Sequence, residues 1–142
     1  MIVVETILHL SEKVEEYYNI TQEIHTIVRE SGVQNGFVAV ITAHTTTGIL
    51  VNEALPCVET DISDMLEKVV PLEAPYAHAH FLPTYGATSN NSQGHLKSVL
   101  TGNHCMFPVI GGEIMCGGAQ DIYLVEFDGP QLRKVFVEVM GE

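Results

Sequence analysis

The stretch 106-MFPVIGGEIMCGGAQDIYLVEFDGPQLRKVFVEVM-140 carries the strongest indication of the fold. β-Branched and aromatic residues dominate three runs in it, 106–110, 113–127 and 132–140, which predicts three strands. The middle run contains Gly117-Gly118, where a strand is weakened and can be interrupted. Gly111-Gly112 and Asp128-Gly129 separate the three runs, and such two-residue turns are typical of β-hairpins. This part of the chain therefore predicts antiparallel strands.

Further strands are expected upstream. Residues 2–10 and 14–18 are rich in β-branched and aromatic side chains, which predicts a hairpin or two neighbouring strands around the polar residues 11–13. The run 36–43, GFVAVITA, is too short and too β-branched for a helix and predicts a buried strand, with a second apolar run at 48–52. In 121–127 and 135–139 the alternation of apolar and polar residues is imperfect. These strands are expected to be covered on both faces, by helices or by another subunit.

Three helices are expected between the strands. The first is capped by Thr21 and ends at Gly32, a left-handed stop. The second begins at Pro56 and ends at Pro71. Its predicted apolar face consists of Val58, Ile62, Met65 and Val69. A third, short helix is expected over 95–101, ending at Gly102, after a long loop over 71–94 of the kind that is usually functional or flexible.

Strands dominate this pattern, helices occur singly, and hairpins outnumber crossovers. The pattern predicts an α+β fold with a mainly antiparallel sheet or sandwich. A chain of 142 residues is about the size of one ordinary domain, and it contains no linker or internal repeat. A single domain over residues 1–142 is therefore expected.

Composition excludes several classes of partner. The net charge is -12 with six Lys and Arg, so the chain cannot build the broad positive patch that binding to nucleic acid or to anionic membranes requires. No apolar run approaches the roughly 20 residues that span a bilayer, and no export signal is visible. Cys57, Cys105 and Cys116 are widely spaced and odd in number, which favours free thiols in a reducing compartment. The expected location is the cytoplasm.

Histidines mark the candidate site. Five of the seven lie between residues 44 and 104, at the ends of elements or in the long loop: His44, His78, His80, His95 and His104. Neutral imidazole is a good ligand for zinc, and three imidazoles with an open position make a catalytic site. No compact zinc motif is present, so hydrogen-bonded loop and cap histidines are the alternative interpretation, and spacing alone favours it.

Other polar residues lie near these histidines. Asn52-Glu53 ends a predicted strand, where turn and capping chemistry is the alternative to a role in catalysis. Asp61 lies in the second helix, where a solvated residue is the favoured interpretation. Gly94 precedes the third helix, where free backbone N–H groups can bind a phosphate, and Lys97 could add charge there. Arg133 is the other candidate to bind an anion.

Several of these motifs occur together in a fixed order. They are His44-Thr45, Asn52-Glu53, Asp61, Tyr76-Ala77-His78, His95-Leu96-Lys97-Ser98, Pro108-Val109-Ile110-Gly111-Gly112, Gln120 and Asp128-Gly129-Pro130. In this order, from about residue 5 to 141, the chain resembles the YjbQ-like family, whose bacterial and archaeal members are described as secondary thiamine-phosphate synthases. Two residues depart from the family pattern. Ala119 stands where the family usually has tryptophan, and Gln131 stands where it has an arginine.

The resemblance implies an α+β sandwich assembled as a homotrimer, with a site at or near a subunit boundary. It favours a divalent metal ion, zinc or magnesium, held by His44, His78 and His95. On the same basis, the candidates for catalysis are Glu53, Asp61 and Lys97. The candidates for binding a small phosphorylated ligand are Asn52, Ser98, Gln120 and Arg133.

The expected function is that of a thiamine-phosphate-synthase-type enzyme. It would join a pyrimidine diphosphate to a thiazole phosphate and release diphosphate, whose charge a metal ion together with Lys97 or Arg133 would neutralise. A non-catalytic trimer that binds a metal ion or a small molecule is the first alternative. A metal-dependent hydrolase with Glu53 or Asp61 as general base is the second.

Overall fold

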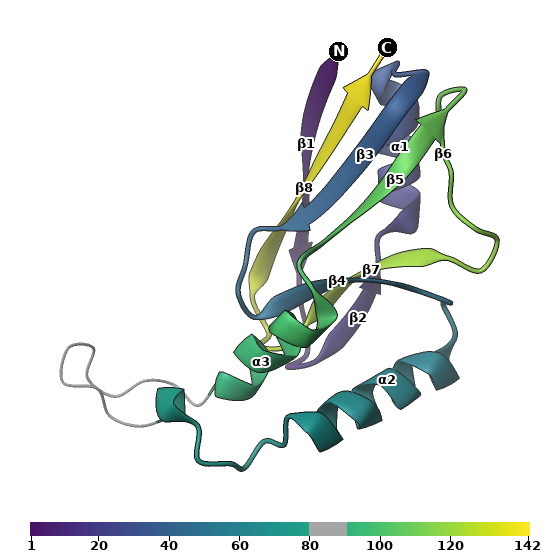
Figure 1. Ribbon diagram of the computed structural model, residues 1–142. Coiled ribbons are helices and arrows are strands. Elements are labelled where there is room, and N and C mark those ends of the chain that lie inside the picture. The colour runs from purple at the N-terminus through teal and green to yellow at the C-terminus, as the bar shows by residue number, and fades with distance from the viewer. Residues whose placement is uncertain (80–90) are drawn as a thin grey trace, which may run out of the picture.

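The computed structural model describes residues 1–79 and 91–142 of the chain, and two antiparallel sheets form its framework (Figure 1). The five-stranded sheet has the order β1-β8-β3-β5-β6, and the three-stranded sheet has the order β2-β7-β4. The strands are β1 (Ile2–Leu10), β2 (Glu16–Asn19), β3 (Asn35–Thr42), β4 (Thr47–Asn52), β5 (His104–Ile110), β6 (Glu113–Ile114), β7 (Asp121–Glu126) and β8 (Leu132–Gly141). The α+β class with mainly antiparallel sheets is confirmed.

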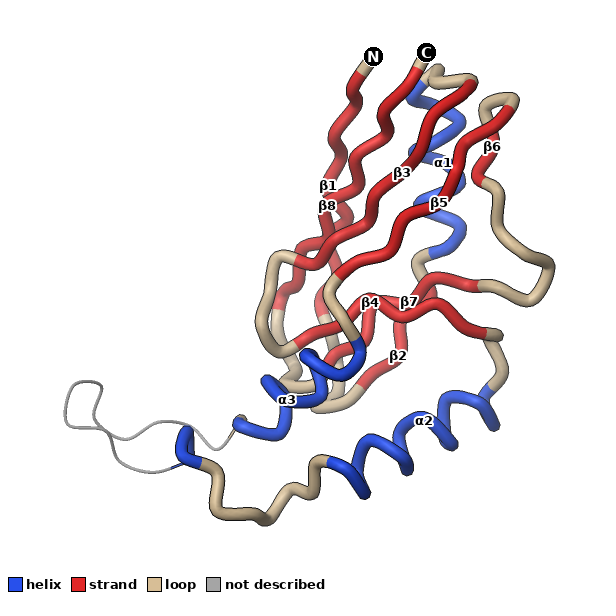
Figure 2. Tube along the Cα trace, viewed as in Figure 1, coloured by secondary structure: helices blue, strands red, loops and turns tan. Residues whose placement is uncertain are grey.

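Helices cover the sheets at separate places (Figure 2). They are α1 (Thr21–Ser31), α2 (Pro56–Val69), the short 3-10 helix η1 (Ala77–Ala79) and α3 (Ser92–Thr101). No helix among the residues described is long and apolar enough to cross a membrane.

The three-stranded sheet is buried on both faces, and β7 is its central strand. Ile122 and Leu124 face the larger core between the two sheets, which α1 also joins. Tyr123, Val125 and Phe127 face the other way and pack with Leu66 of α2. The double coverage expected for 121–127 is therefore confirmed, and α2 supplies the second layer.

Two predicted hairpins are wrong, because strands that are consecutive in sequence enter different sheets. β1 pairs with β8, whereas β2 pairs with β7, so 2–10 and 14–18 form no hairpin. The Asp128-Gly129 turn connects β7 in one sheet to β8 in the other. The run 113–127 is divided into β6 and β7, which also lie in different sheets. The hairpin at Gly111-Gly112 is confirmed, since β5 pairs with β6.

The helix boundaries depend on local residues that the sequence largely identifies. Gly32 ends α1 with φ +79°, and Pro56 is in the first turn of α2, as expected. Thr21 is inside α1 rather than its cap, and its hydroxyl accepts a hydrogen bond from the Ile122 N–H at 2.8 Å. The apolar face predicted for α2 is wrong at Met65 and Val69, which are exposed, because α2 packs on the small sheet mainly through Leu66.

The third helix begins earlier than predicted. α3 starts at Ser92, so Gly94 lies inside its first turn rather than before it. A Cβ on Gly94 would stand 3.0 Å from the Phe127 carbonyl oxygen, which explains why glycine occupies this position. The close approach fixes α3 against the end of β7 and so positions the residues that follow.

The outer face of the five-stranded sheet is largely apolar, with Thr6, Lys134 and Glu138 among its polar residues, and it is uncovered by the described residues. Its exposed side chains include Ile2, Val4, Leu8 and Leu10 of β1, Leu132 and Phe136 of β8, Ile41 of β3, and Met106 and Ile110 of β5. Monomeric proteins rarely expose a continuous apolar face of this extent. The second layer expected over β8 on this side is not part of the described chain.

Candidate functional site around His95

Two pockets meet at His95, which lies in the first half of α3. The first has a volume of about 410 Å³ and is mainly apolar. It is lined by Tyr76, Ala77, His78, Ser92, His95 and Leu96. The rings of His78 and His95 lie edge to face, with centroids 5.0 Å apart. Tyr76 just before η1, His78 within η1 and His95 of α3 thus bring a phenol and two imidazoles to one pocket.

The second pocket, of about 440 Å³, lies on the other side of His95. It is lined by His44, Thr45, His95, Ser98, Val99, Gly102 and Asn103. His44 and Thr45 come from the loop between β3 and β4, and the other residues come from α3 and the two positions that follow it. His95 is the shared wall of an apolar pocket and a more polar one.

His44 is held in one tautomer. Its Nε2 accepts a hydrogen bond of 2.8 Å from the Lys134 backbone N–H, so the ring proton must lie on Nδ1. Burial lowers the pKa of His44, and the positive charge of Arg133 lowers it further. At neutral pH His44 is therefore a neutral N–H donor, and its Nε2 lone pair is already used.

Two serines line the pockets in different ways. Ser98 donates its hydroxyl hydrogen to the Thr47 carbonyl oxygen, so it holds α3 against β4. Ser92 is 4% exposed, and its hydroxyl has no hydrogen-bond partner among the described residues. A buried hydroxyl without a partner is costly, and a ligand in the apolar pocket could supply the missing hydrogen bond.

Lys97 does not face either pocket. Its ammonium group lies 2.9 Å from carboxylate oxygens of both Glu15 and Glu67, and the side chain is 5% exposed. Burial acts to lower the pKa of Lys97, but hydrogen bonds to the two carboxylates outweigh burial and raise it. Two carboxylates already neutralise Lys97 in this structure, and the expectation that it adds charge at a phosphate site stays a prediction.

Arg133 is likewise committed to the core. Its Nε and Nη2 donate to the two carboxylate oxygens of Glu126 at 2.8 and 2.6 Å, and Nη2 also donates to Thr46 Oγ1 at 2.7 Å. Burial acts to raise the pKa of Glu126, but hydrogen bonds from Arg133 and Ser11 outweigh burial and lower it. Arg133 joins β8 to β7 through this pair, and the expectation that it binds an anion stays a prediction.

The remaining candidates lie outside both pockets. Asn52, Glu53 and Asp61 are exposed, and the Asn52 side chain accepts a hydrogen bond from the Glu53 N–H. Gln120 is exposed and its side-chain oxygen accepts from the Gly117 N–H at 2.8 Å, an ordinary loop contact. The ring Nδ1 of His104 forms a hydrogen bond with the side-chain oxygen of the neighbouring Asn103.

The three-histidine metal site is only partly assembled. His78 and His95 are in contact, and His44 and His95 share a pocket, but no three His, Cys, Asp or Glu side chains in the described part of the chain are grouped to hold a metal ion. The physical reason is that Nε2 of His44 already accepts a hydrogen bond from the Lys134 N–H, so its lone pair cannot also bind a metal ion. His80 lies outside the described residues. Residues 1–79 and 91–142 therefore do not fit a metal centre built on these three histidines.

The sequence does not identify Ser92 and Asn103 as pocket residues. Residue 92 fell within the predicted loop, although Asn91 and Ser92 are residue types typical of a helix start. Asn103 follows the glycine that ends α3 and had no signal beyond its place next to His104.

The fold and the pockets define a small two-sheet α+β protein in which two pockets meet at a histidine. The chain belongs to the UPF0047 YjbQ-like family, whose pattern matches residues 6–142.

Relatives from archaea and bacteria match nearly the full chain. A UPF0047 protein of Methanothermobacter thermautotrophicus is 36% identical over 135 residues, which cover 95% of this chain and 89% of the relative. The UPF0047 protein YugU of Bacillus subtilis is 33% identical over 130 residues, with 91% and 92% covered.

Crystal structures of relatives have the same fold. A YbjQ-like protein of unknown function from Sulfolobus solfataricus superposes with a TM-score of 0.91 at 29% identity, over 100% of this chain and 99% of that one. A YjbQ/UPF0047 family protein from Clostridium acetobutylicum superposes with a TM-score of 0.86 at 35% identity, over 96% and 99%.

Proposed function

We propose that the site around His95 binds two small ring compounds and joins them, as a thiamine-phosphate-synthase-type transferase does with a pyrimidine diphosphate and a thiazole phosphate. The observation that carries the proposal is that His95 separates an apolar, ring-lined pocket from a more polar one. Two adjacent pockets of about 400 Å³ suit two ring-sized ligands better than one extended ligand.

The residues of the chain would act by holding and orienting these compounds. Tyr76, His78 and His95 offer ring faces and edges to a planar heterocycle, and Ser92 offers an unpaired hydroxyl. The neutral His44 can donate its Nδ1–H within the polar pocket. In the reaction the thiazole nitrogen forms a bond to the pyrimidine methylene carbon, and the electrons of the breaking carbon–oxygen bond leave with diphosphate.

Charge on the leaving diphosphate must be neutralised. Lys97 and Arg133 are both paired with carboxylates, so neither is a free cation for this task. When bound with the diphosphate, a divalent ion, magnesium or zinc, would supply that charge.

The second candidate is a binding protein without catalysis, and the same two neutralised cations favour it. The ring pocket and the Ser92 hydroxyl would serve binding equally well without any reaction. The hydrolase has no such support, because Glu53 and Asp61 line neither pocket.

We also propose that the protein is a homotrimer in which the outer face of the five-stranded sheet is buried against other copies. The exposed apolar side chains of β1, β3, β5 and β8 support this assembly. The 15.6 kDa chain should then show three times its mass in light scattering. Phe136→Glu, in the middle of this face, should lower the mass, whereas Val14→Glu, exposed elsewhere, should not. A monomer mass for the unaltered protein would contradict the assembly.

Turnover and binding separate the two candidate functions. Purified protein with magnesium and both precursors should release diphosphate in step with formation of the coupled product. His95→Ala should lose at least tenfold in kcat/KM, and His104→Ala, outside both pockets, should retain it. Binding of the pyrimidine compound without turnover would favour the binding protein. Neither binding nor turnover would refute both.

A further inference from the structure

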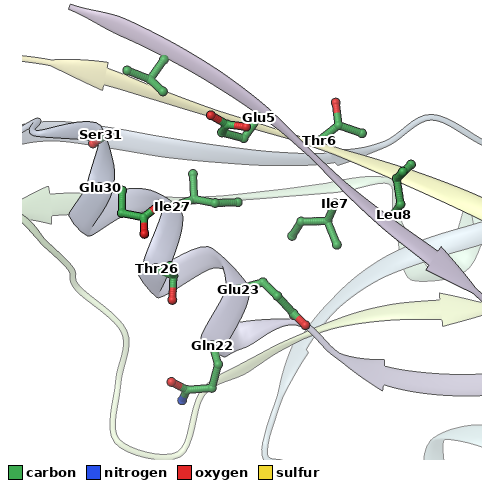
Figure 3. A pocket seen from close by; sticks show the side chains of 11 residues that line it. Glu5, Thr6, Ile7, Leu8, Gln22, Glu23, Thr26, Ile27, Glu30 and Ser31 are labelled. Atoms are coloured by element: carbon green, nitrogen blue, oxygen red, sulfur yellow. The ribbon is translucent and has the colours of Figure 1, made fainter.

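A groove runs between β1 and α1 (Figure 3), at the end of the molecule away from α3 (Figure 1). It has a volume of about 600 Å³. It is lined by Val3, Glu5, Thr6, Ile7, Leu8, Gln22, Glu23, Thr26, Ile27, Glu30 and Ser31. Three of these residues are glutamates and none is Lys or Arg, so the groove is negatively charged.

The groove includes an unpaired sheet edge. β1 is the end strand of the five-stranded sheet, and no strand of the described residues pairs with its other side. Met1 and Gly141 exchange both backbone hydrogen bonds, at 2.8 and 3.1 Å, and Ser11 N–H donates to the Gln131 carbonyl oxygen. Along an antiparallel strand, every second residue forms backbone hydrogen bonds to the neighbouring strand. The odd-numbered residues of β1 therefore form hydrogen bonds to β8, and the even-numbered ones do not. The residues with outward-facing N–H and C=O groups are Ile2, Val4, Thr6, Leu8 and Leu10.

This edge has only one of the usual protections against pairing, the charged side chain of Glu5. Proteins shield long edge strands with proline, lysine, bulges or a covering element. β1 is nine residues long and contains no proline and no lysine. Thr6 and Leu8, whose backbone groups face outward, also line the groove, so the groove gives access to the free edge.

The lining determines which strand would fit. A strand added to β1 directs alternate side chains to opposite faces of the sheet. On the side of α1 these side chains would meet Glu23 and Glu30. One carboxylate oxygen of Glu23 accepts from the Tyr18 hydroxyl at 2.7 Å, and the other is buried without a hydrogen-bond partner in the described residues. On the outer side they would extend the apolar face of Val4 and Leu8.

We infer that the edge of β1 binds an extended peptide segment of another protein, in which basic residues alternate with apolar ones. The backbone of the segment pairs with β1, its Lys or Arg side chains face the glutamates, and its apolar side chains extend the outer face. This chain carries six Lys and Arg against eighteen Asp and Glu, so its charge attracts such a segment, and it has no basic alternating segment of its own to supply.

The test uses the full-length protein and a capped peptide of alternating Lys and Val, about six residues long, the usual length of a strand. Fluorescence anisotropy should show saturable binding that weakens as salt is raised. The same peptide with N-methyl groups on alternate backbone nitrogens keeps its charge but loses its strand hydrogen bonds. It should bind at least tenfold more weakly.

Protein variants separate backbone pairing from charge. Thr6→Pro removes an outward-facing N–H at a position where an edge strand tolerates proline, and it should weaken binding at least tenfold. Glu5→Gln with Glu30→Gln should weaken binding several-fold. Glu12→Gln with Glu73→Gln changes net charge equally at exposed sites outside the groove, and it should have little effect.

Three results would overturn the inference. The first is that the N-methylated peptide binds as well as the unmodified one, which would mean that no strand pairing occurs. The second is that the two double glutamate variants bind the peptide equally well, which would mean non-specific charge attraction. Loss of the oligomer in Thr6→Pro would mean that the β1 edge belongs to a contact between copies of this chain. Because the N-methyl comparison leaves the protein unchanged, it decides the matter even if Thr6→Pro does not fold.

Discussion

Removing the guanidinium of Arg133 is expected to destabilise the protein strongly. The side chains of Arg133 and Glu126 are 4% and 2% exposed, and two parallel hydrogen bonds join them. Arg133→Met fills a similar volume but leaves the Glu126 carboxylate buried without its partner. Breaking such a pair from one side costs about 3–5 kcal/mol.

Urea denaturation followed by circular dichroism measures this loss. With an m-value of about 2 kcal/mol/M, the midpoint should fall by about 2 M. Protein concentration must be equal for all variants, since association adds to apparent stability. Lys134→Met is the matched control, because Lys134 is the exposed neighbour on the same strand, and a change within about 0.5 kcal/mol is expected.

The double variant Arg133→Met with Glu126→Gln tests the cause. If an unpaired buried charge causes the loss, removing that charge should restore a substantial part of the stability. A loss below about 1 kcal/mol in Arg133→Met, together with weaker binding of diphosphate, would refute the structural role and return Arg133 to the ligand site.

Further predictions concern Glu126, Lys97 and the C-terminal end of α1. The pKa of Glu126 is lowered in the folded state, so its contribution to stability is present above its ordinary value of 4.5 and is lost as pH falls through the lowered pKa. The free energy of unfolding, measured at a series of acidic pH values, should therefore fall less steeply with decreasing pH in Glu126→Gln. Lys97→Met should lower the free energy of unfolding by about 1.5–3 kcal/mol, because it removes hydrogen bonds to Glu15 and Glu67, while ligand binding beside His95 persists; the reverse pattern would make Lys97 a ligand-binding residue. Gly32→Ala should cost about 1 kcal/mol in urea unfolding because φ is +79° there, and no cost would contradict the left-handed end of α1.

Local features of the fold were predictable from the sequence, and pairings between distant segments were not. Gly32, Pro56 and Gly111-Gly112 act on their immediate neighbours, so the C-terminal end of α1, the start of α2 and the β5–β6 hairpin were expected correctly. The Asp128-Gly129 turn has the same local pattern as a hairpin. Whether the next strand returns to the same sheet depends on distant partners, here β1 and β3, which no local pattern specifies.

The same limit applies to the candidate site. The family pattern and the histidine positions predicted one metal site on His44, His78 and His95, which stays a prediction; in the structure the three residues line two pockets that share His95. A lysine and an arginine near a site look available for a phosphate until their partners are known. Glu15 and Glu126 approach them only in the folded chain, so charge pairing could not be inferred from spacing.

The position of β8 has a consequence for how the chain folds as it is synthesised. β8 lies between β1 and β3 and pairs with both, so the large sheet cannot close until the segment 132–141 has left the ribosome. Until then the nascent β1 and β3 have apolar side chains and no central partner, a state prone to aggregation. A chain truncated before Leu132 should therefore remain unfolded instead of forming a smaller version of the same sheet.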